Sequence, residues 1–294
     1  MLPPLTAAAR CESRVGRQGG RCGPVMHIDD DLAERLWATA EAMADAAVAR
    51  CLPLFRSAAL ACDDKGLDGR FDPVTQADRD AERAMRDIIA ARRPDDGVLG
   101  EEFGPVAARS GLTWVLDPID GTRAFMAGAP SWGVLIGLDA GAGPILGIVD
   151  QPWTGERFMG GLGRAEMRRG DEAWPLRTRQ CRGLADAVLF TTYPEVGSAA
   201  ERAGFEAVRD RVRLTRYGLD CYAYALVALG QVDLVIEAQL QPYDIQGPQA
   251  VVEAAGGVVT NWRGGPAHRG GRVVAAGDRA VHEAALELLA AVED

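Results

Sequence analysis

The sequence predicts an α+β protein, in which a strand-rich half is joined to a half where helices and strands alternate. Short apolar runs separated by Gly and Pro follow one another from Val98 to Val149, as they do in an antiparallel sheet. Farther along the chain, apolar runs of strand length alternate with helical patterns. The polar segment 177–183 lies between these patterns, so we expect an N-terminal half over 26–178 and a C-terminal half over 179–294.

The N-terminal half should begin with two helices. An acidic run, Asp29 to Asp31, can cap a helix from about Leu32 to Cys62, although Pro53 should kink or interrupt it. A polar loop follows, and Thr75 can cap a second helix over about 76–92. Strands are then expected at 114–116, 132–138, 145–149 and 158–159.

In the C-terminal half, the same patterns predict strands at 188–191, 212–214 and 234–237 and helices near 201–209, 223–229 and 248–255. The final segment, 278–292, has the apolar spacing of an amphipathic helix. Residues 1–25 are rich in Pro, Arg and Gly and lack the apolar core of a signal peptide. We expect them to be a disordered extension, with Met26 as the native first residue; a real but flexible arm is the alternative.

Composition narrows the functional class. The 294 residues are 48% hydrophobic and 25% charged, with a net charge of -10, which argues against the basic face that a nucleic-acid surface needs. No apolar run approaches the roughly 20 residues of a membrane helix. The 6 cysteines form no CxxC pair, which disfavours zinc sites and disulfides and fits a reducing cytoplasm. The 3 histidines lie toward the chain ends, away from the acidic clusters described next.

The segment from Trp114 to Thr122 carries the strongest functional signal. An apolar run delivers Asp117 and Asp120 to the end of a predicted strand, and Gly121-Thr122 follows. Carboxylates are hard ligands suited to Mg²⁺, and backbone N–H groups in a turn after them suit a phosphate oxygen. Asp-Pro and Asp-Gly are also common turn dipeptides. However, two further acidic clusters also follow apolar runs, around Glu101 and Asp244, so a shared site is favoured.

Such a site would permit metal-assisted hydrolysis of a phosphate ester. Four acids would share this site: Glu101, Asp117, Asp120 and Asp244. At close range they could not all be ionised without cations. About two or three Mg²⁺ ions would relieve this repulsion and bind the ester phosphate. The Ile119 carbonyl could add a ligand, and Thr122 could bind the attacking water if Asp78 orients its hydroxyl. No covalent nucleophile is needed.

The combined motifs resemble those of the inositol monophosphatase family, from about Asp31 to the C-terminus. The motifs are Asp117-Pro-Ile-Asp-Gly-Thr122, Gly100-Glu-Glu102 and Pro242-Tyr-Asp244 with the Glu253–Val258 stretch. The resemblance implies a layered α-β-α-β-α sandwich, of the kind shared with fructose-1,6-bisphosphatase. It also implies a lithium-sensitive, Mg²⁺-dependent phosphomonoesterase, a small phosphate monoester as substrate and a homodimer.

The resemblance further implies roles for individual residues. The metal ligands would be Glu101, Asp117, the Ile119 carbonyl, Asp120 and Asp244, with Glu101 also acting in catalysis. Gly121 and Thr122 would bind phosphate through their backbone N–H groups, and Asp78 and Thr122 would place the water.

Within the family, three segments are similar to histidinol-phosphatases: Arg123 after the Asp-Gly-Thr run, Asp150 to Phe158, and Tyr217 to Tyr224, where Leu219 replaces a usual Gly. Histidinol phosphate carries an amine and an imidazole, so acids at Asp220 and Glu237 would suit its cationic leaving group, and Asp120 is also expected to bind the substrate. Alternatively, Asp220 only caps a helix and Glu237 only pairs locally.

Arg157 could reach the substrate or a partner subunit, or could be a solvated hairpin arginine. Asp150 is expected to be structural.

Three other functions compete with this reading. An inositol-1-monophosphatase, or a broader sugar-phosphate phosphatase, would differ only in the residues that face the substrate. A haloacid-dehalogenase-type phosphatase has a DxDGT motif, whereas two residues separate Asp117 from Asp120. A binding protein that assists transcription would not need the metal ligands, all of which are present.

Overall fold

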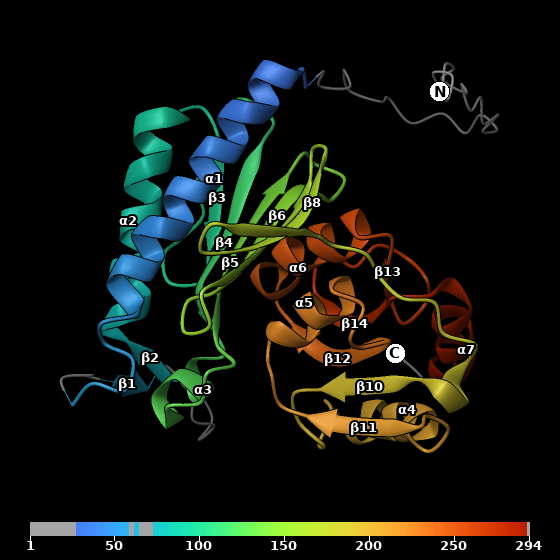
Figure 1. The fold of residues 1–294 in the computed structure, drawn as a ribbon. Coiled ribbons are helices and arrows are strands. Elements are labelled where there is room, and N and C mark those ends of the chain that lie inside the picture. Colours follow the sequence, from blue (N-terminus) through green and yellow to red (C-terminus); the bar gives the residue numbers. More distant parts are fainter. Residues whose placement is uncertain (1–27, 59–61, 65–72, 293–294) are drawn as a thin grey trace, which may run out of the picture.

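The computed structural model describes residues 28–58, 62–64 and 73–292 (Figure 1). The predicted extension over 1–25 and the proposed start at Met26 lie outside these residues. Helices and sheets stack in the order α-β-α-β-α, so the predicted layered α+β fold is confirmed (Figure 1). Within the described part of the chain, no helix combines the length and the apolar character needed to cross a bilayer.

The first layers come from the N-terminal part of the chain. Helices α1 (Asp30–Cys51) and α2 (Gln76–Arg92) cover one face of a 7-stranded sheet. Its strands, in spatial order, are β3 (Gly97–Gly100), β4 (Thr113–Asp120), β5 (Gly133–Asp139), β6 (Pro144–Gln151), β7 (Glu156–Gly161), β8 (Arg164–Arg169) and β9 (Glu172–Pro175). Only the β3–β4 pair is parallel within this sheet. The short strands β1 (Cys62–Asp64) and β2 (Pro73–Thr75) pair separately, and α3 (Thr122–Ala127) follows β4.

The remaining layers come from the C-terminal part. Helices α5 (Tyr222–Ala228) and α6 (Pro242–Ala254) lie between the two sheets (Figure 1). The second sheet has the spatial order β11 (Leu214–Tyr217), β10 (Val188–Thr191), β12 (Leu234–Leu240), β14 (Gly271–Ala276), β13 (Val258–Asn261). A short 3₁₀ helix, η1 (Leu184–Asp186), precedes β10, and α4 (Ala199–Arg209) and α7 (Arg279–Leu289) cover the outer face. The division of the chain near residue 178 stays a prediction.

The predicted boundaries differ from the observed ones at several elements. Helix α1 ends at Cys51, not at Cys62, because Pro53 has no N–H to continue the helix. Helix α6 begins at Pro242 rather than near Pro248, and β11 begins at Leu214 rather than Val212. Strands β8, β9, β13 and β14 were not predicted individually, whereas α2 has its predicted bounds.

Helix α6 lies close against the first sheet because three glycines face it. Gly137, Gly147 and Gly160 are paired in register across β5, β6 and β7. A Cβ on Gly147 would overlap the Gly247 carbonyl oxygen of α6, and one on Gly137 would lie 2.9 Å from the Gln246 Cβ. The helix therefore meets the sheet backbone directly, and this contact also brings the start of α6 to β4.

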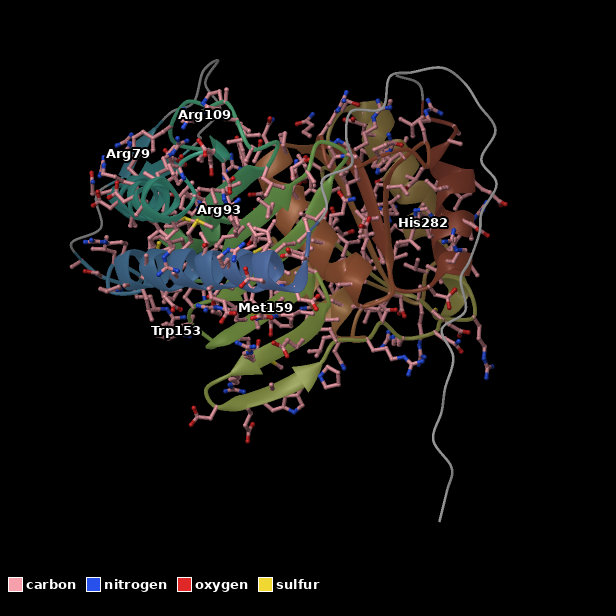
Figure 2. All side chains as sticks on the ribbon, turned by 90° about the horizontal axis from the view of Figure 1, so that it is seen from above. Arg79, Arg93, Arg109, Trp153, Met159 and His282 are labelled. Atoms are coloured by element: carbon pink, nitrogen blue, oxygen red, sulfur yellow. The ribbon has the colours of Figure 1, made fainter. Side chains whose placement is uncertain are left out.

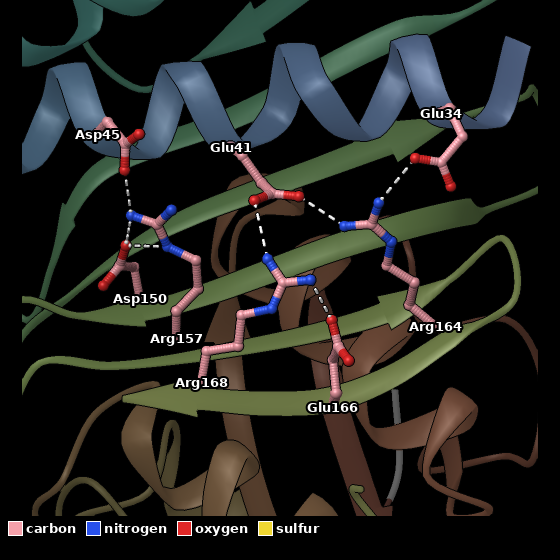
Figure 3. A network of polar contacts seen from close by, with 8 residues as sticks. All are labelled: Glu34, Glu41, Asp45, Asp150, Arg157, Arg164, Glu166 and Arg168. Atoms are coloured by element: carbon pink, nitrogen blue, oxygen red, sulfur yellow. Dashed lines mark hydrogen bonds and ion pairs between the residues drawn. The ribbon is translucent and has the colours of Figure 1, made fainter. Parts of the chain in front are cut away.

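On the opposite face, arginines of the sheet hold α1 (Figure 3). Glu41 of α1 accepts hydrogen bonds from Arg164 at 2.5 Å and from Arg168 at 3.1 Å. Arg164 also lies over the Trp37 ring, with its guanidinium carbon 4.8 Å from the ring centroid. Because these arginine side chains are partly shielded, the ion pairs supplement the apolar contacts of α1 with the sheet.

Candidate active site

The site begins at the end of β4, where the strand departs from regular pairing. The register between β4 and β5 shifts between Asp117 and Asp120, on either side of Pro118, which has no N–H for the ladder. Asp117 Oδ1 accepts a hydrogen bond from the Ile119 N–H at 3.0 Å. Gly121 follows with φ of 81° and a Cβ there would lie 2.8 Å from the Asp220 Cγ, so only glycine fits. The chain then turns directly into α3.

Three of the predicted metal ligands form one cluster. Oxygen atoms of Asp117, Asp120 and Asp244 all lie within 4.8 Å of one another. Asp244 comes from the first turn of α6, where its Oδ2 accepts a hydrogen bond from the Gln241 N–H at 2.7 Å. The fold thus brings Asp117 and Asp120 of β4 close to Asp244 of α6, although more than a hundred residues separate them along the chain.

Burial and mutual repulsion raise the pKa values of these acids. Burial raises the pKa of Asp117 well above its usual range, and the charges of Glu101, Asp120 and Asp244 raise it further. The pKa of Asp244 is raised by burial and then by Asp120, and that of Asp120 rises to about 7 through burial and Asp220. Of the three, Asp117 is buried and Asp120 and Asp244 are partly buried. Carboxylates that lie so close together in a shielded place fit a hard divalent cation, which would compensate their charge.

Glu101 reaches the same cavity from the end of β3. The turn that carries it is held by Glu82 of α2, a buried acid whose Oε2 accepts a hydrogen bond from the Glu102 N–H at 2.7 Å. Glu82 was not singled out from the sequence, since an acid in a helix ordinarily lies in solvent.

The candidate water-binding residues meet where α2 and α3 begin. Thr122 Oγ1 donates a hydrogen bond to the Ile119 carbonyl at 3.1 Å and lies 3.4 Å from Asp78 Oδ1. The other carboxylate oxygen, Asp78 Oδ2, accepts hydrogen bonds from the Thr75 N–H at 2.8 Å and from its hydroxyl at 2.5 Å. Burial raises the pKa of Asp78, against the lowering effect of Thr75. Asp78 therefore caps α2 with one oxygen and faces Thr122 with the other.

A cavity of about 980 Å³ connects most of the predicted residues. Its lining includes nine of them: Glu101, Asp117, Ile119, Asp120, Gly121, Thr122, Asp220, Glu237 and Asp244. Asp78 lies behind Thr122, as described above. The residues predicted for the metal, for phosphate and for the leaving group thus share one space.

Asp220 and Glu237 are positioned by neutral donors. Asp220 Oδ2 accepts a hydrogen bond from the Ser131 hydroxyl at 2.8 Å, in place of capping α5. Glu237 Oε1 accepts hydrogen bonds from the Thr192 N–H at 2.6 Å and from its hydroxyl at 2.8 Å. Burial raises the pKa of Glu237 to about 7 and also raises that of Asp220, although Arg123 lowers the latter. Leu219, the residue in place of Gly, adopts φ of 78°.

Arg157 faces α1 instead of the cavity (Figure 3). Its guanidinium pairs with Asp150 at 2.6 Å and with Asp45 at 2.8 Å, and its side chain is only 20% exposed. Arg157 is therefore not a solvated hairpin arginine. Asp150 pairs with its guanidinium, which agrees with the structural role expected of Asp150. Contact of Arg157 with a substrate or a partner subunit stays a prediction.

Several cavity residues were not assigned from the sequence. Arg123 donates a hydrogen bond to the Tyr193 hydroxyl at 3.0 Å, and both line the cavity with Arg202. Tyr224 also lines it, and its buried hydroxyl has no hydrogen-bond partner among the described residues. Tyr193 follows the end of β10, and the carboxyl ends of parallel strands commonly border sites in open sheets, so its position could have indicated it.

Known proteins resemble this chain over most of its length. The model of the inositol monophosphatase family matches residues 32–294. A relative named bifunctional phosphatase IMPL2, chloroplastic, from Arabidopsis thaliana is 40% identical over 273 residues, covering 89% of this chain and 77% of the relative. A histidinol-phosphatase from Mycobacterium tuberculosis is 37% identical over 219 residues, covering 71% and 84%. A solved structure of an inositol monophosphatase from Zymomonas mobilis is 39% identical, with a TM-score of 0.76, and covers 87% of this chain and 98% of that chain.

Proposed function

Because the chain belongs to the inositol monophosphatase family, we propose that it hydrolyses L-histidinol phosphate to L-histidinol and phosphate in histidine biosynthesis, with Mg²⁺ as cofactor. The chain is a phosphoric monoester hydrolase, as its named relatives are. The substrate, the metal ion and the roles of single residues belong to the proposal. A homodimer, lithium sensitivity and a cytoplasmic location also stay predictions.

We choose histidinol phosphate as the proposed substrate because of two acids, Asp220 and Glu237, in the cavity of the metal-ligand cluster. Asp220 and Glu237 line the same cavity as the cluster and are held by hydroxyl and backbone donors. Their raised pKa values mean that burial disfavours their negative charge in the free protein. A leaving group with an ammonium and an imidazole would offset that cost through charge-assisted hydrogen bonds, whereas inositol offers only hydroxyls.

The metal ligands we propose are Glu101, Asp117, the Ile119 carbonyl, Asp120 and Asp244. When bound, Mg²⁺ supplies Lewis acidity and neutralises the charges of the carboxylates and the phosphate. The N–H groups of Gly121 and Thr122 bind the phosphate at the turn into α3.

Thr122 and Asp78 place the attacking water. With Asp78 ionised, its Oδ1 accepts a hydrogen bond from the Thr122 hydroxyl across the 3.4 Å contact, and Thr122 keeps its proton. The Thr122 oxygen then has a lone pair free to accept a hydrogen bond from a water, which orients the water oxygen toward phosphorus. No side chain forms a covalent bond to phosphorus in this scheme.

Inositol 1-phosphate, or another sugar phosphate, is the second candidate substrate. It is favoured by the Zymomonas mobilis structure, whose protein is named an inositol monophosphatase. Both candidates use the same metal ligands, so only the groups around the leaving group separate them.

Substitution of the two acids tests the proposed substrate. Asp220→Asn and Glu237→Gln should each raise KM for histidinol phosphate by about tenfold or more, because a charge-assisted bond to the leaving group is lost. Turnover of p-nitrophenyl phosphate, which has no cationic leaving group, should change by less than about twofold. Asp150→Asn is the control, as this buried acid faces Arg157 and α1. Equal effects on both substrates would contradict the proposal.

A further inference from the structure

Helix α3 carries Thr122 but is too short to hold its own position. It has 6 residues, and the contact that it makes with α2 through Thr122 and Asp78 is long, at 3.4 Å. A small displacement of α3 would therefore break the contact that orients the Thr122 hydroxyl. Something outside the helix must fix its place.

The turn after α1 supplies that support at the far end of α3. Arg56 donates two hydrogen bonds, from Nε at 2.9 Å and from Nη2 at 2.8 Å, to the carbonyl of Gly128, the residue that caps α3. The preceding residue, Phe55, packs its ring 5.4 Å from that of Phe125 of α3. The turn thus contacts α3 at two points: the backbone carbonyl of Gly128 and the buried side chain of Phe125.

A third element completes the contact. The Arg56 guanidinium lies over the ring of Trp153, 4.5 Å from its centroid, and Trp153 belongs to the turn between β6 and β7. Figure 2 shows Trp153 at the outer edge of the molecule, beside α1, and the residue is 47% exposed. Arg56 therefore joins the α1 turn, the end of α3 and the β6–β7 turn on the surface of the protein.

The backbone of Arg56 is strained. Its φ is 60°, in the left-handed region that residues other than glycine rarely adopt. Such a conformation persists only where the surrounding contacts impose it, and it occurs preferentially near functional sites. The bonds to Gly128 and the stacking on Trp153 are the contacts that hold Arg56 in this conformation.

We propose that Arg56 is a positioning residue for the hydrolysis: it fixes the C-terminal end of α3 and so keeps Thr122 in place against Asp78. The inference rests on the proposed role of Thr122 and Asp78 in placing the water. Because Arg56 lies outside the substrate cavity and acts through Thr122, its loss should affect the reaction step more than substrate binding, which Thr122 and Gly121 share with the other phosphate and metal ligands.

Steady-state kinetics of the full-length Mg²⁺-loaded enzyme test this role, with both histidinol phosphate and p-nitrophenyl phosphate as substrates. Arg56→Ala should lower kcat by about ten- to a hundredfold, with KM changed by a clearly smaller factor, as expected for displacement of a catalytic group from afar. Arg56→Lys keeps the charge over Trp153 but loses the paired donors, so its kcat should be intermediate. Added guanidinium at a non-denaturing concentration should partly restore kcat of Arg56→Ala, and equal urea should not.

Arg263 offers a matched control. It donates hydrogen bonds to the carbonyls of Ala290 and Val292 at the end of α7, at 2.7 Å and 2.6 Å, as Arg56 does at the end of α3. Arg263→Ala should lower the melting temperature without changing kcat. An unchanged kcat in folded Arg56→Ala would overturn the inference, as would equal kcat losses in Arg56→Ala and Arg263→Ala. If the wild-type enzyme hydrolysed p-nitrophenyl phosphate but not histidinol phosphate, the proposed substrate would be wrong. The kcat of Arg56→Ala on p-nitrophenyl phosphate would still test the role of Arg56.

Discussion

At the scale of single residues, the site depends on carboxylates placed where their charge is unfavourable. Asp120 connects the metal-ligand cluster with the segment that carries Asp220 and Cys221. Its oxygens lie near those of Asp117 and Asp244, and its Oδ2 accepts a hydrogen bond from the Cys221 N–H at 2.7 Å, which ties β4 to the start of α5. Its pKa of about 7 reflects burial and the nearby charge of Asp220. Function and stability therefore oppose each other at this residue.

Replacement of Asp120 should separate these effects. Asp120→Asn should lower turnover of p-nitrophenyl phosphate by more than about a hundredfold, because a charged ligand is lost. In EDTA, the same variant should be more stable than wild type, by the order of 1–2 kcal/mol, since the amide removes a disfavoured buried charge but can still accept the Cys221 bond. Phosphate release and thermal denaturation measure the two effects. Asp80→Asn, a surface change, is the control, and a variant that keeps a tenth of the turnover would contradict the metal assignment.

Part of the site could be predicted from the sequence because its residues follow one another along the chain. Asp117 to Thr122 form one strand end and one turn, so their proximity needs no knowledge of the fold. By contrast, the sequence left Arg157 either as a contact to the substrate or a partner subunit or as a solvated hairpin arginine, because the direction of its side chain depends on how β7 faces α1. The support given by Glu82 and Arg56 joins distant segments, and no local pattern indicates it.

At the scale of elements, the position of α6 connects the packing of the sheet to the metal ligands. The glycines of β5, β6 and β7 let α6 approach the sheet backbone, and Asp244 lies in the first turn of this helix. Any side chain added to this face must push α6 outward. Asp244 would then move away from Asp117 and Asp120.

Gly147→Ala should therefore impair both folding and metal binding. We expect a loss of about 1–3 kcal/mol in the free energy of unfolding, as is usual for overpacking. The affinity for Mg²⁺, measured by calorimetry, should fall as well. Gly104→Ala is the control, because a Cβ there would meet nothing within 4 Å. Unchanged stability and affinity in Gly147→Ala would show that α6 is not held in this way.

The elements that the sequence predicted best have strong local signals. Helix α2 has a capping box between Thr75 and Asp78 and begins where predicted. The start of α6 was missed because Gly247-Pro248 reads as a helix boundary, whereas here Pro248 lies inside the helix and Gly247 makes the close contact with the sheet. Strand β13 pairs with β14, and β14 in turn pairs with β12, so the places of both strands come from the second sheet as a whole.

At the scale of the whole molecule, the buried acids make stability depend on pH and on cations. The pKa values are raised to about 7 for Asp120 and Glu237 and to about 6 for Asp150, chiefly by burial. Each group holds its proton more tightly in the folded chain than in the unfolded chain. The stability that they contribute is therefore complete below a pH of about 4 and is lost as the pH rises through about 6 to 7.

Thermal denaturation of the metal-free protein checks this dependence. In EDTA, the melting temperature should fall by at least about 4 °C between pH 5 and pH 7.5, which corresponds to a loss of the order of 1–2 kcal/mol. With Mg²⁺ in excess the fall should be smaller, because the cation favours the ionised carboxylates and binds only the folded state. A melting temperature that rises with pH in EDTA would contradict the assignment of these groups.

The central claim is that one cavity combines a metal-dependent phosphatase site with acids that select a cationic leaving group. The most direct test is phosphate release by the wild-type enzyme with Mg²⁺, comparing kcat/KM for histidinol phosphate and inositol 1-phosphate. We expect a preference of about a hundredfold or more for histidinol phosphate, equivalent to about 2.7 kcal/mol of transition-state binding. A preference for inositol 1-phosphate would contradict the role given to Asp220 and Glu237.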